Sequence, residues 1–249
     1  MAMLEVRGLC KSYPKFRLND VSFSLENGRI MGFIGRNGAG KTTTLKSILH
    51  IVHPDAGEIR YFGMDFADHE NEIKQKIGFA GGAVDFYKRR KVRDIISVTK
   101  KFYENWDEAA YRKYMDAFSL DEDKTLSQLS EGMKVKFSLV PALSHHAELL
   151  ILDEPTSGLD PVSREELLEI FRYCAGEGVA ILFSTHITSD IEKCADDISY
   201  IAKGNMVATG TLESFMAEHR AKGAGNSLDE IMVFCEKEDI HEKLNAKRV

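Results

Sequence analysis

A glycine-rich segment from Gly35 to Thr42 constrains this chain more than any other part of its sequence. It reads Gly-Arg-Asn-Gly-Ala-Gly-Lys-Thr, with an apolar run over 29–34 before it and helical spacing over 41–51 after it. Glycines let successive backbone N–H groups point inward around a phosphate, and the positive end of the following helix adds to the attraction. An ordinary glycine turn is the simpler alternative, but this strand and helix context predicts a phosphate-binding loop.

Two uninterrupted apolar runs, 149–152 and 179–183, indicate the fold around this loop. A helix expected over 163–174 separates them, and such runs alternating with helices are typical of a parallel sheet covered on both faces. We therefore expect an α/β fold, a sheet sandwiched by helices, with a β-rich N-terminal part. Further strands are expected at 3–7, 21–25, 58–62 and 76–80, and further helices at 92–103, 108–118 and 131–143. Pro141 should kink or shorten the last of these helices.

Polar residues end both apolar strands. Asp153 directly follows the first, where a carboxylate can hold Mg²⁺, usually through water, opposite the Thr42 hydroxyl. Glu154 can orient or deprotonate a water for attack on a γ phosphate. His186 follows the second strand at the same carboxyl edge, where open α/β sheets bind ligands. An acidic loop and a structural histidine are the alternatives; the position favours phosphate chemistry.

Two short motifs flank the Asp153 strand. Leu129-Ser130-Glu131-Gly132-Met133 precedes it and Ser157-Gly158-Leu159-Asp160 follows it. With these motifs in this order, the chain resembles the nucleotide-binding subunit of an ATP-binding cassette (ABC) transporter, over residues 13 to about 210. The segment 102–107 and the short C-terminal region are more similar to the ABC-2 or bacitracin-exporter-like group. A kinase or GTPase would share the phosphate loop but would not need the two flanking motifs.

The resemblance implies a fold and a role for each motif. The fold would be a P-loop nucleoside triphosphatase, a single domain over 1–249 with a helical ABC-specific subdomain over about 82–143 and a peripheral tail over about 211–249. Tyr13 would stack on adenine, Glu154 would be the catalytic base and His186 the switch histidine. Lys41 would reach the β and γ phosphates, and Thr42 and Asp153 would hold Mg²⁺. The Walker A residues that would contact ATP are Gly35, Arg36, Asn37, Gly38, Ala39, Gly40, Lys41, Thr42 and Thr43.

The resemblance also implies a head-to-tail dimer. In it, Ser130 and Gly132 of one subunit would close over the γ phosphate bound by the other, and Asp160 would communicate between the two sites. The residues supply a reason, because a serine that opens a helix and a nearby glycine expose N–H groups and a hydroxyl to an anion. Two such helix ends can act on one ATP only if two chains associate. The implied partners are a second ABC subunit, identical or different, and a separate membrane-spanning permease, which ATP hydrolysis would drive, as an exporter.

Two motifs depart from the family pattern, at three positions. Glu131 and Met133 replace the third and fifth residues of the usual LSGGQ signature, while Ser130 and Gly132 remain, so activity should survive. Gly82 stands at about the position where the family usually has Gln or an acidic residue that touches Mg²⁺ and the attacking water. Water or Asp85 could take its place, and the sequence does not choose between them.

The charge balance limits the partners of the chain. With a net charge of -6 over 249 residues, its field would repel nucleic acid, so we expect no nucleic-acid partner. The basic run over 88–93 would then face an acidic loop of the permease, lipid head groups or only solvent. No apolar run reaches the ~20 residues of a membrane span. We therefore expect a cytoplasmic chain, bound to the inner face of the membrane through its permease, with cysteines as reduced, buried thiols.

Overall fold

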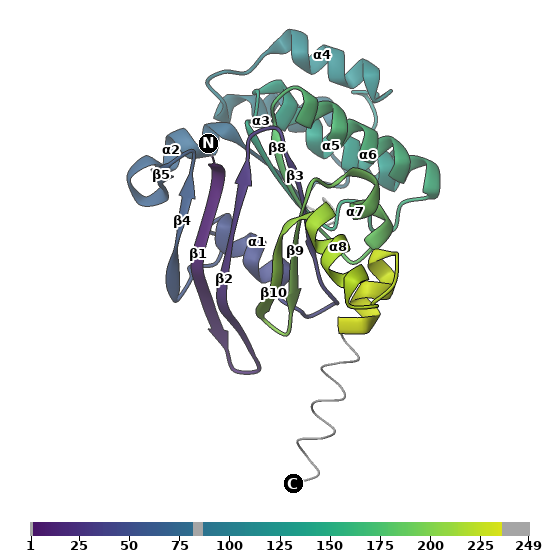
Figure 1. Cartoon of the computed structure of the whole chain (residues 1–249). Coiled ribbons are helices and arrows are strands. Elements are labelled where there is room, and N and C mark those ends of the chain that lie inside the picture. The colour runs from purple at the N-terminus through teal and green to yellow at the C-terminus, as the bar shows by residue number, and fades with distance from the viewer. Residues whose placement is uncertain (1, 82–86, 236–249) are drawn as a thin grey trace.

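The computed structural model describes residues 2–81 and 87–235, which form one ten-stranded sheet with helices packed against it (Figure 1). The strands follow the order β5-β4-β1-β2-β10-β9-β3-β8-β7-β6. The antiparallel side consists of β5 (Met64–Asp65), β4 (Ala56–Tyr61), β1 (Ala2–Tyr13) and β2 (Phe16–Glu26). The parallel side consists of β9 (Asp197–Ala202), β3 (Ile30–Ile34), β8 (Ala180–Thr185), β7 (Leu149–Asp153) and β6 (Ile77–Gly81). The strand β10 (Asn205–Thr211) is antiparallel to β9 and meets β2 only at Asn19.

The central parallel strands are apolar along their whole length because both of their faces are buried. In β3, Ile30 and Ile34 face one core, while Met31 and Phe33 face the other. The strands β7 and β8 alternate in the same way between these two cores. Because the strands run parallel, their carboxyl ends meet at one edge, with β8 between β3 and β7. This edge carries the predicted site, and the sheet predicted from the apolar runs is confirmed.

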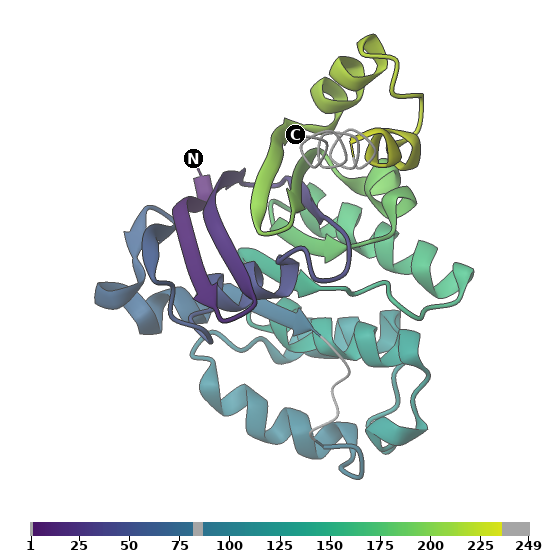
Figure 2. The same ribbon diagram turned by 90° about the horizontal axis from the view of Figure 1, so that it is seen from below.

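Helices cover the two faces of the sheet. The first core lies under α3 (Val92–Thr99), α4 (Glu108–Ala117), α5 (Glu131–Ser144), α6 (Pro161–Gly176), α7 (Thr188–Cys194) and α8 (Leu212–Ala221). The second core contains α1 (Lys41–Ile48) and α2 (Phe66–Lys76). Short 3-10 turns, η1 (Lys100–Phe102) and η2 (Leu126–Gln128), follow α3 and precede α5. In Figure 2, the teal helices α3 and α4 and the yellow C-terminal helices lie at opposite ends of the molecule.

Several elements differ from the sequence-based expectation. The first two strands are longer than predicted, and α2, β9 and β10 were not predicted. Pro141 does not shorten α5, which continues through it to Ser144. The tail after residue 211 is not wholly peripheral, because Phe215, Met216, Leu228 and Ile231 are buried in the first core. No helix in the described part of the chain is long and apolar enough to cross a membrane.

The cysteine expectation holds for two of four residues. Cys174 and Cys194 are buried, and burial raises the pKa of their thiols to about 11 and about 12. Cys10 and Cys235 are only partly buried.

Candidate functional site

The loop between β3 and α1 has a backbone that only glycine accommodates well. Gly38 and Gly40 have φ angles of 81° and 120°, in the region that L side chains rarely adopt. A Cβ on Gly35 would lie 2.3 Å from the Ile201 carbonyl oxygen. These glycines let the chain turn from the end of the buried strand into the first turn of α1, where the backbone N–H groups have no helical partner. The loop is therefore built as a cradle for an anion.

Lys41 lies at the bottom of this cradle and is only 5% exposed. Its Nζ donates a hydrogen bond to the Gly35 carbonyl oxygen at 2.7 Å and forms an ion pair with Glu154 Oε1 at 3.1 Å. A buried ammonium needs such compensation because burial removes its hydration. A bound phosphate would offer the same negative charge, so it could release Glu154 from Lys41.

Asp153 ends β7 beside the phosphate loop. Its Oδ1 accepts hydrogen bonds from Thr42 Oγ1 at 3.3 Å and from Ser184 Oγ at 2.6 Å. A hydroxyl and a carboxylate side by side are oxygen donors that suit Mg²⁺, so this pair fits the predicted metal site. Ser184, in β8, fixes the orientation of the carboxylate, a role that the sequence analysis did not assign.

Glu154 is held in an uncommon backbone conformation. Its φ is 51°, and its N–H is donated to Ser184, with the hydroxyl oxygen at 2.9 Å and the carbonyl oxygen at 3.1 Å. A non-glycine residue in the left-handed region needs such support, and residues of this kind cluster at functional sites. Its second carboxylate oxygen, Oε2, lies 2.8 Å from His186 Nδ1. Glu154 thus contacts both Lys41 and His186 at the edge of the sheet.

Lys41, Thr42, Glu154 and His186 line one open cavity of about 590 Å³, whereas Asp153 lies outside its lining. Its lining consists of Lys15, Phe16, Arg36, Asn37, Gly38, Gly40, Lys41, Thr42, Thr43, Glu154, Ser157 and His186. Lys15 and Phe16 were not expected from the sequence, and Ser157 was named there only as part of the motif after the Asp153 strand. A Cβ on Gly40 would lie 3.0 Å from the Phe16 ring, so the aromatic side chain packs against the phosphate loop. Tyr13 lies outside this lining, is 44% exposed, and has Lys11 Nζ 5.9 Å from its ring centroid; its contact with adenine stays a prediction.

The signature residues do not line this cavity. Ser130 is the N-cap of α5, and its Oγ accepts a hydrogen bond from Met133 N at 3.2 Å. Gly132 packs so closely on α6 that a Cβ would lie 2.7 Å from Ser163 Oγ. That hydroxyl donates to Asp160 Oδ2 at 2.6 Å, and this hydrogen bond holds the pKa of Asp160 below its usual value. Asp160 also caps α6, which begins with proline at its first position.

Two further predictions concern the segment that follows β6. Gly82 and Asp85 lie outside the described residues. The basic run that follows is exposed from Lys88 to Arg90, while Lys91 and Arg93 both pair with Asp123, at 3.0 Å and 2.6 Å. Part of this run is therefore used in local ion pairs.

Comparison with known proteins agrees with this geometry. Residues 18–157 match the family described as ABC transporter. The bacitracin transport ATP-binding protein of Bacillus licheniformis is 33% identical over 209 residues, which cover 82% of this chain and 68% of that protein. A Nod factor export ATP-binding protein of Burkholderia orbicola is 33% identical over 216 residues, covering 84% and 71%.

Solved structures give the same result. A structure of an ATP-binding subunit of an ABC transporter superimposes with a TM-score of 0.82 at 31% identity, covering 93% of this chain and 98% of that chain. A nucleotide-free ATP-binding cassette superimposes with a TM-score of 0.75 at 20% identity, covering 88% and 94%, and supports the fold. The resemblance and the fold class inferred from the sequence are confirmed. The chain belongs to the ABC transporter family, as one of its ATP-binding, ATP-hydrolysing subunits.

Proposed function

We propose that this chain hydrolyses ATP in sites shared between two chains, and that this cycle drives a separate membrane-spanning exporter. The relatives named for bacitracin transport and Nod factor export support the exporter assignment. The chain would then work at the inner face of the cell membrane, held there by its permease. Its partner in the ATP site would be a second copy of itself or a related ABC subunit.

In the proposed reaction, residues of the phosphate-loop side do the chemistry. Lys41 binds the β and γ phosphates and gives up its ion pair with Glu154. The freed Glu154 carboxylate accepts a proton from a water molecule as the water oxygen attacks the γ phosphorus. The bond from this phosphorus to the β–γ bridging oxygen breaks, and the electron pair leaves with ADP. His186 donates a hydrogen bond to the γ phosphate from the end of β8, beside Glu154.

Thr42 and Asp153 would hold Mg²⁺ in this reaction. When bound there, the ion supplies positive charge that offsets the charge of the phosphate oxygens. Ser184 keeps the Asp153 carboxylate turned toward Thr42 through its 2.6 Å hydrogen bond. It also fixes the backbone of Glu154, so this one serine positions both acidic residues.

One observation carries the shared site. The cavity at the phosphate loop is open, and Ser130 and Gly132 are absent from its described lining. Ser130 caps an exposed helix end that has an anion-binding character but no anion to bind within its own chain. A second chain placed head to tail would bring that helix end over the open cavity. ATP would then join the two chains, and its hydrolysis would separate them.

The surface proposed for the permease lies at the start of the helical layer. Tyr87, Val98 and Phe102 are large apolar residues with more than half of their surface exposed, at 58%, 55% and 70%. The exposed basic residues from Lys88 to Arg90 follow Tyr87 directly. Apolar side chains beside a basic loop suit a partner loop that is partly apolar and partly acidic.

The dependence of turnover on protein concentration tests the shared site. If two chains form each site, ATPase activity per chain rises with concentration and then levels off as dimers form. Ser130→Arg should abolish this rise, because its side chain blocks the helix end. Ser97→Arg, at an exposed serine on α3, is the matched control and should behave like wild type. Activity per chain that is constant over a thousandfold dilution, with Ser130→Arg fully active, would overturn the proposal.

A further inference from the structure

Three polar side chains from separate elements meet in the interior behind the proposed site. They are Thr156 in the loop after β7, Arg164 in the first turns of α6, and Asp190 in the first turn of α7. Thr156 and Asp190 are completely buried. Arg164 Nε approaches Asp190 Oδ1 to 3.9 Å, which is too long for a hydrogen bond.

These groups are close together but incompletely satisfied. Thr156 Oγ1, Arg164 Nε and both carboxylate oxygens of Asp190 have no hydrogen-bond partner among the described residues. The Thr156 hydroxyl faces the carboxyl without the geometry of a full hydrogen bond. A buried polar group without a partner typically destabilises a protein by about 1–3 kcal/mol, and charged groups cost more. Four such atoms in one place therefore need an explanation.

The charges around Asp190 show how unfavourable its position is. Burial raises the pKa of its carboxyl, while the Thr156 hydroxyl and the Arg164 guanidinium act in the opposite direction. The other charged groups that face it are Lys193 on its own helix and Glu165 on α6, and these two pair with each other. The thiol of Cys194 donates to the Asp190 carbonyl oxygen, not to its carboxylate.

Each member of the cluster lies a few positions along the chain from a different residue of the proposed site. Thr156 follows Glu154 by two positions, and its carbonyl oxygen accepts a hydrogen bond from Leu159 N at 3.3 Å. Arg164 N donates to the Asp160 carbonyl oxygen at 3.0 Å in the first turn of α6. Asp190 lies four positions after His186, and α7 begins two residues after that histidine. Through these three links, Glu154, Asp160 and His186 are all connected to the same buried cluster.

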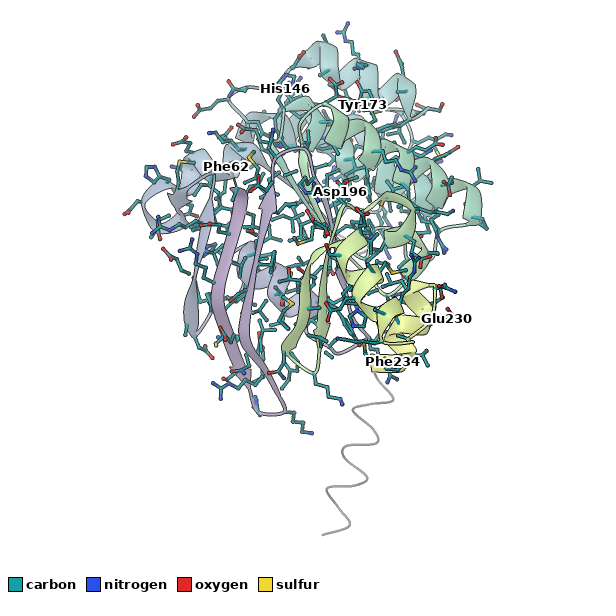
Figure 3. The ribbon with its side chains drawn as sticks, viewed as in Figure 1. Phe62, His146, Tyr173, Asp196, Glu230 and Phe234 are labelled. Atoms are coloured by element: carbon teal, nitrogen blue, oxygen red, sulfur yellow. The ribbon has the colours of Figure 1, made fainter. Side chains whose placement is uncertain are left out.

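The helix α7 is also held from its other side. Thr188 Oγ1 donates to Asp229 Oδ1 at 2.6 Å, and Glu192 accepts a hydrogen bond from Leu228 N. Residues 228–235 are helical, and Leu228 and Ile231 are buried; Figure 3 labels Glu230 and Phe234 on this segment. The C-terminal helix and α7 therefore form one packed unit. A movement of about 1 Å of this unit toward α6 would bring Arg164 and Asp190 within hydrogen-bond distance.

We propose that Thr156, Arg164 and Asp190 form a buried latch, which closes when ATP and a second chain engage the site and so fixes Glu154, Asp160 and His186 for hydrolysis. This inference rests on the proposed function. The three residues lie outside the lining of the cavity at the phosphate loop, and they act as positioning residues. Closing the 3.9 Å gap between Arg164 and Asp190 would give both groups a hydrogen bond that they lack among the described residues, and this gain would favour the closed arrangement.

Steady-state ATPase kinetics of four variants test the latch. Asp190→Asn and Thr156→Val keep the shape of the side chain but remove the charge or the hydroxyl, whereas Thr156→Ser keeps the hydroxyl. Because an error of about 1 Å in positioning can cost on the order of 10²-fold in rate, we expect kcat to fall about 10- to 100-fold in Asp190→Asn and Thr156→Val. The KM for ATP should stay within about twofold, because the phosphate loop is untouched, and Thr156→Ser should recover most of kcat. The double variant that combines Asp190→Asn with Thr156→Val should have a kcat no lower than that of the slower single variant, as expected for residues that act as a unit.

Two controls separate a latch from a merely structural role. Ser144→Ala removes another buried hydroxyl, which bonds to the Val140 carbonyl oxygen outside the cluster, and should leave kcat unchanged. Thermal melting of Asp190→Asn should stay within a few degrees of wild type, because the variant removes a buried carboxylate that is unfavourable when ionised. Equal kcat for Thr156→Val and Thr156→Ser, or a wild-type kcat in Asp190→Asn, would overturn the latch. If wild type itself did not hydrolyse ATP, the proposed function would fail instead.

Discussion

The phosphate loop and the signature helix end, the two features proposed to contact phosphate, differ in how complete they are. Around Lys41, the ammonium group, the Glu154 carboxylate and the His186 imidazole each have a partner within the chain. Around Ser130, the helix end is capped and exposed, and Gly132 is pressed against Ser163. In the proposed function, the phosphate-loop side supplies the catalytic groups, whereas the signature side is the surface that contacts the second chain.

This difference has a physical consequence for regulation. In the proposed reaction, the ion pair between Lys41 and Glu154 opens only when phosphate charge takes the place of the carboxylate at Lys41. The signature helix end carries no such charge, and it would contact the phosphate only from a second chain. The proposed reaction therefore needs both events, nucleotide binding within one chain and association with another.

Substitution of Lys41 should have the largest effect on the phosphate-loop side. Lys41→Ala removes the cation that meets the charge developing on the γ phosphate, and loss of one such donor typically lowers kcat about 10²–10³-fold. It also leaves Glu154 without its ion-pair partner, so ATP binding should weaken as well. Turnover of the purified variant, with melting to show that it is folded, measures this. A folded Lys41→Ala protein with near wild-type turnover would mean that the loop has been wrongly assigned.

Acidification should lower stability through His145, which lies at the end of α5 far from the signature residues. His145 follows the end of α5 and stacks on Tyr103 with ring centroids 3.8 Å apart, and burial lowers its pKa to about 4. Between this value and the unfolded pKa of about 6.5, the unfolded chain binds more protons, so the free energy of unfolding falls as the pH drops through this window. From about pH 7.5 to about pH 5, this should cost about 2 kcal/mol.

The variant His145→Phe isolates this contribution. It keeps an aromatic ring that can stack on Tyr103 but cannot take up a proton. Urea unfolding at both pH values should show a smaller loss for His145→Phe than for wild type. The same loss in both proteins would place the acid-sensitive group elsewhere.

The aromatic residues of the β1–β2 hairpin should have a smaller effect, on ATP affinity. Stacking of a base on an aromatic ring contributes about 1–3 kcal/mol, so loss of the stacking residue should weaken ATP binding about tenfold. Tyr13→Ala tests the residue predicted from the family, and Phe16→Ala tests the residue that lines the cavity. Titration of both variants with fluorescent ATP, and competition with inorganic triphosphate, decides between the two residues. Loss of the stacking residue should weaken the binding of ATP but not of inorganic triphosphate, which has no base.

The sequence predicted those parts of the molecule that depend on local pattern. The phosphate loop needs consecutive glycines, and the central strands are buried on both faces, so each leaves a signal within a few residues. The strand β10 left none, because its burial alternates between intermediate and exposed and it carries few large apolar residues. Ser184 and the cluster of Thr156, Arg164 and Asp190 could not be found either, since their contacts join residues about thirty positions apart, and only the packing of α6 and α7 brings them together.

The central claim is that ATP bridges the phosphate loop of one chain and the Ser130 helix end of another. Glu154→Gln tests it most directly, because the substitution keeps size and hydrogen bonding but removes the base, slowing hydrolysis by about 10²–10⁴-fold. The measurement is the molar mass of Glu154→Gln by light scattering after size exclusion, with ATP and with ADP. A second variant, which adds Ser130→Arg to Glu154→Gln, tests whether the two chains associate through the Ser130 helix end.

We predict a dimer with ATP, a monomer with ADP, and a monomer with either nucleotide once Ser130→Arg is added. ADP fails because it lacks the γ phosphate that reaches the opposite helix end. A monomer with ATP, in protein shown to bind ATP, would contradict a site shared between two copies of this chain. So would an ATP-dependent dimer that Ser130→Arg leaves intact.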